Sequence, residues 1–215
     1  MNLEKLLSIL TDRTLFFPSG TTLARDDKYE GQPTSGEVDA LSLEPATVGK
    51  LENKFNKPTQ ARFFFNCWHM NDSESDAMWK IYVNGIGGVA IRSSIVRLKQ
   101  CFQNSQEDIS LGRIHYINDE TGHFEHPLRR YMRKKSAFKH EQEVRLVFYD
   151  ENNEYSGCPG LSIPVDVSVL VERIVVSPRA ESWFLPLVKK LVIKLGHEIE
   201  VVSSEGSAPL PIGPS

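Results

Sequence analysis

The spacing of apolar residues predicts a helix near each end of the chain. Apolar residues at positions 3, 6, 7 and 10 follow the period of one helix face, and Asn2 precedes them as a capping residue. A second amphipathic helix is predicted over residues 181–195. The side chains of this helix that are expected to point inward are Trp183, Leu187, Val188, Leu191 and Leu195.

Short runs of β-branched and aromatic residues predict strands between these helices. The predicted strands cover residues 14–18, 61–69, 88–94, 112–117, 144–149, 171–176 and 198–202, with further helices over 74–82 and 95–102. The last strand, helix and strand predict a right-handed parallel crossover. We therefore expect an α+β fold with a mixed, largely antiparallel sheet flanked by helices and a C-terminal β-α-β unit.

The length of 215 residues is enough for one sizeable core. Residues 1–203 are expected to form a single globular domain and residues 204–215 a loose C-terminal tail. Between residues 31 and 58, Gly, Pro, Ser and Thr recur. This composition predicts a long loop with one short helix around residues 45–55.

Charge and cysteine usage narrow the class of protein. A formal net charge of -3 gives no general attraction to nucleic acids or acidic membranes, so any anion site has to be local. No apolar run approaches the ~20 residues of a membrane span, which predicts a cytoplasmic protein without membrane contact. Three widely spaced cysteines suggest no disulfide framework, and Cys67 is expected to be a buried hydrophobic residue.

The familiar catalytic and nucleotide-binding motifs are missing from the sequence. It has no phosphate-binding Gly-x-x-x-x-Gly-Lys loop, no Gly-x-Gly-x-x-Gly fingerprint, no zinc pattern and no Gly-x-Ser-x-Gly elbow. Polar residues at predicted strand ends remain as candidates, since such positions can converge on one cleft. They are His69, Arg92, Ser93, Glu141 and Glu143.

A Glu-x-Glu motif precedes the strand predicted over residues 144–149. Side-chain alternation places Glu141, Glu143 and Arg145 on one face if this strand begins early. The nearby cations Lys139, His140 and Arg145 either neutralise the two carboxylates on a solvated edge or leave them for a reaction. Residues 129–139 carry six basic residues in eleven, which indicates a solvated helix face or a phosphate-facing patch.

Five short motifs, taken together, resemble a bacterial family catalogued as domain of unknown function 2971. They are residues 27–31, 67–69, 74–82, 88–94 and 138–146, and the match runs from about residue 3 to 202. The family's usual Asn-Asp-Pro-Phe-Glu element is replaced here by residues 26–30. The resemblance implies a role in phage defence and abortive infection, and it carries over no particular reaction.

A looser similarity links the opening residues 2–18 and the late Glu-x-Glu motif to ADP-ribosyltransferases. This resemblance implies NAD as the ligand, with Glu143 acting on the nicotinamide ribose and Glu141 activating the acceptor, a nucleic acid or a protein. A carboxylate suits this chemistry because cleavage of the glycosidic bond develops an oxocarbenium-like cation. The implied dinucleotide-binding residues are His69, Arg92 and Ser93, with Trp79 or Tyr82 stacking on nicotinamide.

Three functions therefore remain open. The first is an ADP-ribosyltransferase-like effector that uses NAD. The second is a Mg²⁺-dependent nuclease in which Asp26, Asp27 or Glu30 joins the Glu-x-Glu carboxylates around the metal and the basic run contacts phosphates. The third is a non-enzymatic module that captures a nucleotide or a protein partner. The sequence predicts no oligomeric state.

Overall fold

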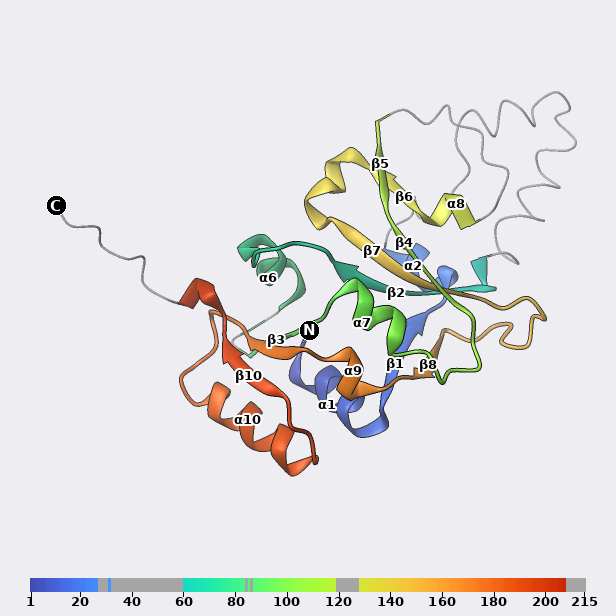
Figure 1. Ribbon diagram of the computed structural model, residues 1–215. Helices are drawn as coiled ribbons and strands as arrows, with labels where there is room; N and C mark the ends of the chain where they lie inside the picture. Colours follow the sequence, from blue (N-terminus) through green and yellow to red (C-terminus); the bar gives the residue numbers. More distant parts are fainter. Residues whose placement is uncertain (27–30, 32–59, 84, 86, 119–127, 208–215) are drawn as a thin grey trace, which may run out of the picture. The chain divides into compact units, whose positions relative to one another are not determined.

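The computed structural model describes residues 1–26, 31, 60–83, 85, 87–118 and 128–207 (Figure 1). The loop predicted over residues 31–58, with its short helix, falls outside this set except for Gly31. The chain divides into two compact units: residues 1–15, 71–105 and 164–215 belong to unit 1, and residues 16–70 and 106–163 to unit 2. That residues 1–203 act as one domain stays a prediction.

Unit 1 is built on a three-stranded sheet with the strand order β10-β9-β3. Strand β3 (Val89–Arg92) pairs antiparallel with β9 (Arg173–Val176), and β10 (Glu200–Ser203) pairs with β9 in parallel. Helix α10 (Phe184–Lys194) connects β9 to β10 and packs against β10 (Figure 1). This arrangement confirms the predicted C-terminal β-α-β unit.

Four α-helices of unit 1 begin at side chains that accept hydrogen bonds from the first turn, whereas α10 has no such cap. In α1 (Leu3–Asp12), the Asn2 side chain accepts from the N–H of Lys5 at 3.2 Å, as its position in the sequence predicts. Ser75, Ser94 and Asp166 cap the other three described helices that have such a bond: α6 (Asp76–Tyr82), α7 (Ile95–Gln100) and α9 (Val167–Leu170). The short 3₁₀ helix η2 (Glu205–Ser207) lies within the segment predicted as a tail.

The buried face of α10 confirms the prediction for Val188, whereas Leu187, Leu191 and Leu195 are only partly buried. Its buried residues are Phe184, Val188 and Val192, which follow one another at intervals of four. Trp183, which was expected to point inward, is 56% exposed because it precedes the first turn and lies outside this stripe. Its ring contacts Phe184 edge to face, with the centroids 5.7 Å apart.

Unit 2 is built on an antiparallel sheet with the strand order β2-β7-β4 (Figure 1). The central strand β7 (Glu143–Tyr149) pairs with β2 (Phe63–His69) on one side and β4 (Ile109–Arg113) on the other. Its core contains Phe63, Phe65, Tyr131 and Val147. The antiparallel sheet here and the mixed sheet of unit 1 together confirm the predicted α+β class with largely antiparallel pairing.

The remaining elements of unit 2 are short. They are α2 (Gly20–Asp26), β5 (His115–Ile117), α8 (Leu128–Tyr131), β6 (Arg133–Lys135) and the 3₁₀ helix η1 (Ser136–Glu141). Strand β5 pairs with β6 in parallel. Strands β1 (Thr14–Pro18) and β8 (Gly160–Pro164) form a separate two-stranded sheet.

The single strand predicted over residues 112–117 is wrong, since the chain divides there into β4 and β5. The break falls at Ile114, whose side chain is buried. The N–H of Ile114 still donates to the carbonyl oxygen of Glu143 on β7, at 3.0 Å. From His115 onward the chain turns and pairs with β6 instead. The turn matters for the site, because β5 carries Tyr116 toward Glu143.

The corrected face of α10 predicts opposite effects for two neighbouring aromatic residues. Phe184→Ala empties a buried position and should lower the free energy of unfolding by about 3–5 kcal/mol. Trp183→Ala removes an exposed ring and should cost less than about 1 kcal/mol. Urea unfolding of the two variants beside the wild type measures both values, and a larger loss for Trp183→Ala would contradict this packing.

Candidate active site

The start of β7 is a sharp turn between two carboxylates. Gln142 ends η1 in the left-handed region (φ 41°, ψ 52°), which non-glycine residues adopt infrequently. Its N–H donates to the carbonyl of Lys139 at 3.2 Å, and its carbonyl accepts from the N–H of Met70 at 2.9 Å. This held turn leaves Glu141 at the end of η1 and Glu143 as the first residue of β7.

Glu143 forms a buried, two-pronged ion pair with Arg145, two residues further along the same strand face. The two side chains are 6% and 1% exposed. Arg145 Nε donates to Glu143 Oε1 at 2.5 Å, and Nη2 donates to Oε2 at 3.2 Å. A third donor, Arg145 Nη1, reaches the carbonyl oxygen of Tyr131 at 2.6 Å. This geometry fixes the carboxylate in place.

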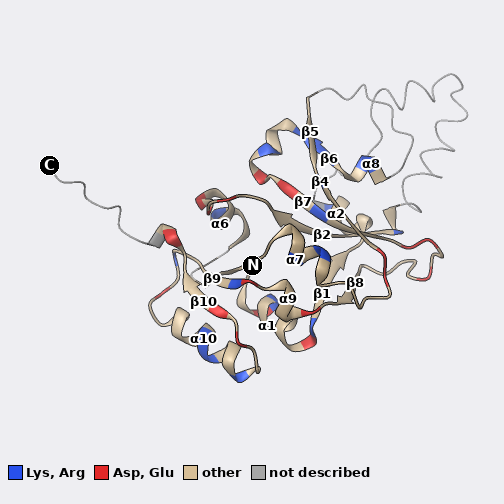
Figure 2. Ribbon diagram, in the orientation of Figure 1, with Lys and Arg blue, Asp and Glu red and all other residues tan. Residues whose placement is uncertain are grey.

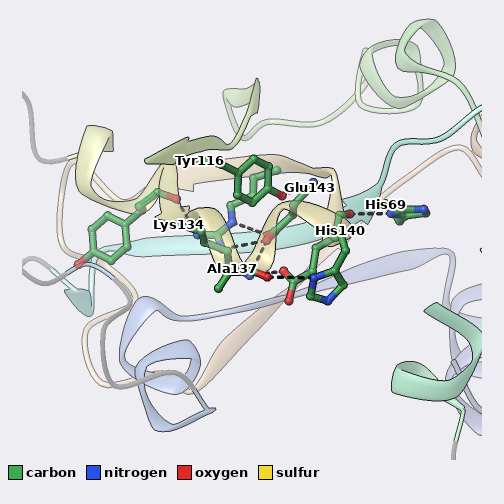
Figure 3. A network of polar contacts seen from close by, with 9 residues as sticks. His69, Tyr116, Lys134, Ala137, His140 and Glu143 are labelled. Carbon is green, nitrogen blue, oxygen red and sulfur yellow. Dashed lines mark hydrogen bonds and ion pairs between the residues drawn. The ribbon is translucent and has the colours of Figure 1, made fainter. Parts of the chain in front are cut away.

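Lys134 from β6 supplies a second cation to the same carboxylate (Figure 3). Its Nζ lies 2.7 Å from Glu143 Oε2 and 2.6 Å from Glu141 Oε2, so the two carboxylates share one ammonium group. The Lys134 and Glu141 side chains are both 14% exposed. The cluster of Glu141, Glu143, Lys134 and Arg145, here called the charge cluster, therefore carries balanced charges largely shielded from water.

The pairing fixes the ionisation of the charge cluster. Burial alone raises the pKa of Glu143, but the charges and hydrogen bonds of Arg145 and Lys134 outweigh it and lower this pKa to about 2. Burial lowers the pKa of Lys134, yet the two carboxylates reverse this and raise it above its ordinary value. Glu143 and Lys134 are thus both charged across the physiological pH range.

Tyr116 from β5 lies beside Glu143 (Figure 3). Its hydroxyl oxygen accepts a hydrogen bond from the backbone N–H of Glu143 at 2.8 Å. Burial raises the pKa of Tyr116, and the nearby carboxylates Glu143 and Glu141 raise it further. The phenol therefore stays protonated and keeps an O–H donor at the start of β7.

Two residues of β2 face the same side of the sheet. Cys67 is the cross-strand partner of Arg145, and His69 is the partner of Glu143. The prediction that Cys67 is buried is wrong. It shares a face of β2 with the buried Phe63 and Phe65, but it is exposed because burial along this strand ends after Phe65. Its thiol hydrogen-bonds the Glu143 carboxylate and so helps to lower that pKa.

His69 has one nitrogen occupied and one available. Its Nδ1 lies 2.6 Å from the carbonyl oxygen of Glu141, and because a carbonyl only accepts, Nδ1 carries the hydrogen. In the neutral ring Nε2 is then an acceptor. This atom is buried and has no hydrogen-bond partner within the described part of the chain. A buried acceptor of this kind suits a ligand hydroxyl.

The other predicted dinucleotide-binding residues belong to unit 1. Ser93 Oγ donates to the carbonyl of Leu170 at 2.6 Å. The side chain of Arg92 is half-exposed, and its Nε lies 3.5 Å from Oε1 of Glu172. Their role in binding NAD stays a prediction. The structure supplies each of the two with a contact inside unit 1 that is independent of any ligand.

Trp79 and Tyr82, the predicted stacking residues, lie on α6 in unit 1. Trp79 is 8% exposed within an apolar cluster, and its indole N–H donates to the Glu74 carboxylate at 3.0 Å. Tyr82 is 57% exposed. Stacking on nicotinamide stays a prediction for both, with Tyr82 presenting the more accessible ring.

The acidic residues proposed for the magnesium site are only partly described. Asp27, Glu30 and the side chain of Asp26 lie outside the described residues. Within residues 1–25, 60–83, 87–118 and 128–207, no three His, Cys, Asp or Glu side chains are grouped so that they could hold a metal ion. Glu141 and Glu143 together present two carboxylates to one cationic centre, Lys134.

Sequence reasoning identified Glu141 and Glu143 but missed Lys134 and Tyr116 as their partners. In the sequence, Lys134 was noted only as one of the six basic residues of the run over residues 129–139. The alternation of side chains in a strand over residues 133–135 could have separated it from its neighbours, had a strand been predicted there. Tyr116 carried no such signal, because its approach depends on the parallel pairing of β5 with β6.

Comparison of the chain with protein-family models, with curated proteins and with solved structures gave no match in any of the three. The resemblance to the family of unknown function 2971 therefore stays a prediction. Among the described helices, none combines the length and apolar content that a membrane span requires.

The buried ion pair predicts a specific acid sensitivity. The folded pKa of Glu143, about 2, lies below its ordinary value of 4.5, so Glu143 adds stability above pH 4.5 that disappears as the pH falls toward 2. Glu143→Gln should lower the free energy of unfolding at pH 7 by about 3–5 kcal/mol. It should also make this free energy depend less on pH between 4.5 and 2. Urea unfolding from pH 7 to 2 measures both effects.

The matched control for this prediction is Glu151→Gln, which neutralises an exposed carboxylate of unit 2. It should leave the stability at pH 7 within about 0.5 kcal/mol of the wild type. If both variants changed the free energy of unfolding by the same small amount and kept the pH dependence of the wild type, the protein would gain no stability from the pairing of Glu143 with Arg145 and Lys134.

Proposed function

We propose that this protein is an ADP-ribosyltransferase-like enzyme that takes NAD or a related nucleotide as its substrate, with Glu143 as the catalytic carboxylate. One observation carries the proposal. An ionised glutamate is held in a largely water-excluded position as the first residue of a strand, and a second carboxylate, Glu141, lies beside it and shares Lys134. A role of such an enzyme in phage defence is part of the proposal.

The chemistry of nucleotide glycosides explains why such a carboxylate is useful. As the bond between ribose and nicotinamide breaks, positive charge develops on the ribose ring. A carboxylate that is already ionised and fixed stabilises this charge without reorganising at the moment of reaction. The low pKa of Glu143 supplies the ionised form at every physiological pH. Its ion pair with Arg145 supplies the fixed position.

A neutralised carboxylate has to become available before it can stabilise a cation. Arg145 is 1% exposed and holds both oxygens of Glu143, so it acts as the permanent partner. Lys134 is more accessible, at 14%, and bridges the two glutamates through single contacts. Lys134 is therefore the cation that moves toward the diphosphate of an incoming dinucleotide and releases Oε2 of Glu143 to the ribose.

Unit 2 contains groups that fit the ribose of such a substrate. The buried Nε2 of His69 lacks a hydrogen-bond partner in the described structure and suits a ribose hydroxyl as donor. The protonated hydroxyl of Tyr116 offers a donor beside Glu143. In this proposal His69 and Tyr116 bind and orient the sugar, Glu143 faces the developing charge, and Glu141 takes the proton of the acceptor.

A Mg²⁺-dependent nuclease is the second candidate, and one observation favours it. Oε2 of Glu141 and Oε2 of Glu143 both lie within 2.7 Å of the same cationic atom, Lys134 Nζ. Two carboxylates that converge on one cation resemble half of a divalent metal site. Under this alternative, Mg²⁺ would bind in competition with Lys134 and would hold a phosphodiester for hydrolysis.

The transferase proposal predicts that two glutamine substitutions separate the roles of the two glutamates. Wild-type protein should bind NAD saturably in calorimetry and release nicotinamide. Glu143→Gln should slow nicotinamide release by about 100-fold or more with a smaller change in KM, because the lost interaction acts in the transition state. Glu141→Gln should keep nicotinamide release and lose transfer to an added nucleic-acid or protein acceptor.

Glu151→Gln serves as the control and should match the wild type in both assays. If Glu143→Gln folds poorly, Glu143→Asp keeps the charge and should retain part of the activity. Absence of saturable binding and of nicotinamide release at millimolar NAD would rule the transferase out. Cleavage of an oligonucleotide that requires Mg²⁺ would then establish the nuclease instead.

A further inference from the structure

We propose that Gly31 is a positioning residue for Glu143, and that it acts through the ring and the backbone of Tyr131. Gly31 is buried and lies against the Tyr131 ring. The carbonyl of Tyr131 holds Arg145, and Arg145 holds the carboxylate of Glu143. The effect of Gly31 on a reaction rests on the function proposed above, whereas its effect on the Glu143 carboxylate can be measured without any substrate.

The backbone of Gly31 approaches the Tyr131 ring too closely for any side chain at position 31. A Cβ atom there would overlap Cε1 of Tyr131 and would lie 2.8 Å from Cζ and 3.0 Å from Cδ1. Gly31 also has a φ of 71°, in the left-handed region that favours glycine. A substitution at this position therefore has to displace the ring or the backbone of residue 31.

The Tyr131 ring has little space into which it could retreat. It is 2% exposed, and its centroid lies 5.1 Å from the ring centroids of both Phe63 and Phe65. Gly20 of α2 also lies close, since a Cβ atom there would be 3.4 Å from Cε1 of Tyr131. Because a core is close-packed, a push on the ring is passed on to the backbone of the same residue. A side chain at position 31 thus moves the carbonyl of Tyr131.

This carbonyl is a fixed point of the charge cluster. It accepts from Nη1 of Arg145 at 2.6 Å, which leaves Nε and Nη2 directed to the two oxygens of Glu143. Helix α8 ends at Tyr131, and β6 begins two residues later and carries Lys134, the second cation of Glu143. Acidic and basic positions follow one another at the start of β7, where these cations converge (Figure 2). A shift of Tyr131 therefore alters the contacts of both cations with Glu143.

Two measurements test this inference: the ¹³C NMR titration of the Glu143 side-chain carboxyl carbon, and the kinetics of nicotinamide release. Gly31→Ala should raise the titration midpoint of Glu143 from about 2 toward 4.5, by about one pH unit, because the cations then stabilise the ionised carboxylate less. It should also lower kcat by about tenfold or more with little change in KM, since a misplaced carboxylate is lost to the transition state.

The matched control is Gly157→Ala, which introduces the same side chain at another left-handed glycine of unit 2. Gly157 has a φ of 81°, and a Cβ atom there would have no atom of the described residues within 4 Å. This variant suffers the backbone strain without the contact, so it should keep the midpoint and the kcat of the wild type. Equal changes in the two variants, or an unchanged midpoint in Gly31→Ala, would overturn the inference.

A second variant separates the contact with the ring from other effects at position 31. Tyr131→Leu keeps the backbone carbonyl and removes Cε1 and Cζ, the two atoms nearest to the added Cβ. In this background Gly31→Ala should shift the midpoint less than it does in the wild type, and an equal shift would contradict action through the ring.

The same pair of substitutions covers a failure of Gly31→Ala to fold. Adding Tyr131→Leu should then restore folding, because it relieves the overlap, and a combination that stays unfolded would overturn the inference. A wild type that releases no nicotinamide would refute the proposed function. The titration midpoints of the variants would still decide whether Gly31 positions Glu143.

Discussion

The burial of the Glu143–Arg145 ion pair is the constraint around which unit 2 is organised. Removing two charges from water costs more than their attraction returns unless the remaining polar atoms are also satisfied. The structure meets this requirement with the carbonyl of Tyr131 on Arg145, with Lys134 on the free side of Glu143 and with the hydroxyl of Tyr116 on the Glu143 backbone. The short strands β5 and β6 supply the last two of these groups.

The same network decides what chemistry the site can perform. Arg145 holds Glu143 in one place, and Lys134 keeps its charge balanced while no ligand is bound. A group that draws Lys134 away converts a neutral cluster into one with a net negative charge. An anionic dinucleotide and a divalent cation would both change the position of Lys134, the first by attraction and the second by displacement. In the transferase proposal the dinucleotide attracts Lys134, whereas in the nuclease proposal the divalent cation displaces it.

Much of this arrangement follows from local patterns in the sequence. The alternation of strand side chains predicted a shared face for Glu143 and Arg145. Apolar periodicity predicted α1, and runs of β-branched and aromatic residues predicted β7 and the strands of the C-terminal β-α-β unit. The errors arose where the neighbouring sequence misled. Cys67 follows three phenylalanines and was expected to be buried, yet it is exposed because burial along β2 ends after Phe65. The partnership of Lys134 with Glu143 depends on the parallel pairing of two three-residue strands, too short for any periodicity to show.

The most direct test of the buried ion pair is the titration of the glutamate side-chain carboxyl carbons by ¹³C NMR, with the Glu143 signal assigned from the spectrum of a Glu143→Gln variant. The account predicts that the Glu143 signal keeps the chemical shift of an ionised carboxylate as the pH is lowered through 4.5, and that protonation approaches its midpoint only near pH 2 or at acid unfolding. A midpoint at or above 4.5 in the folded protein would show that Arg145 and Lys134 do not hold Glu143 as an ion pair, and would contradict the account.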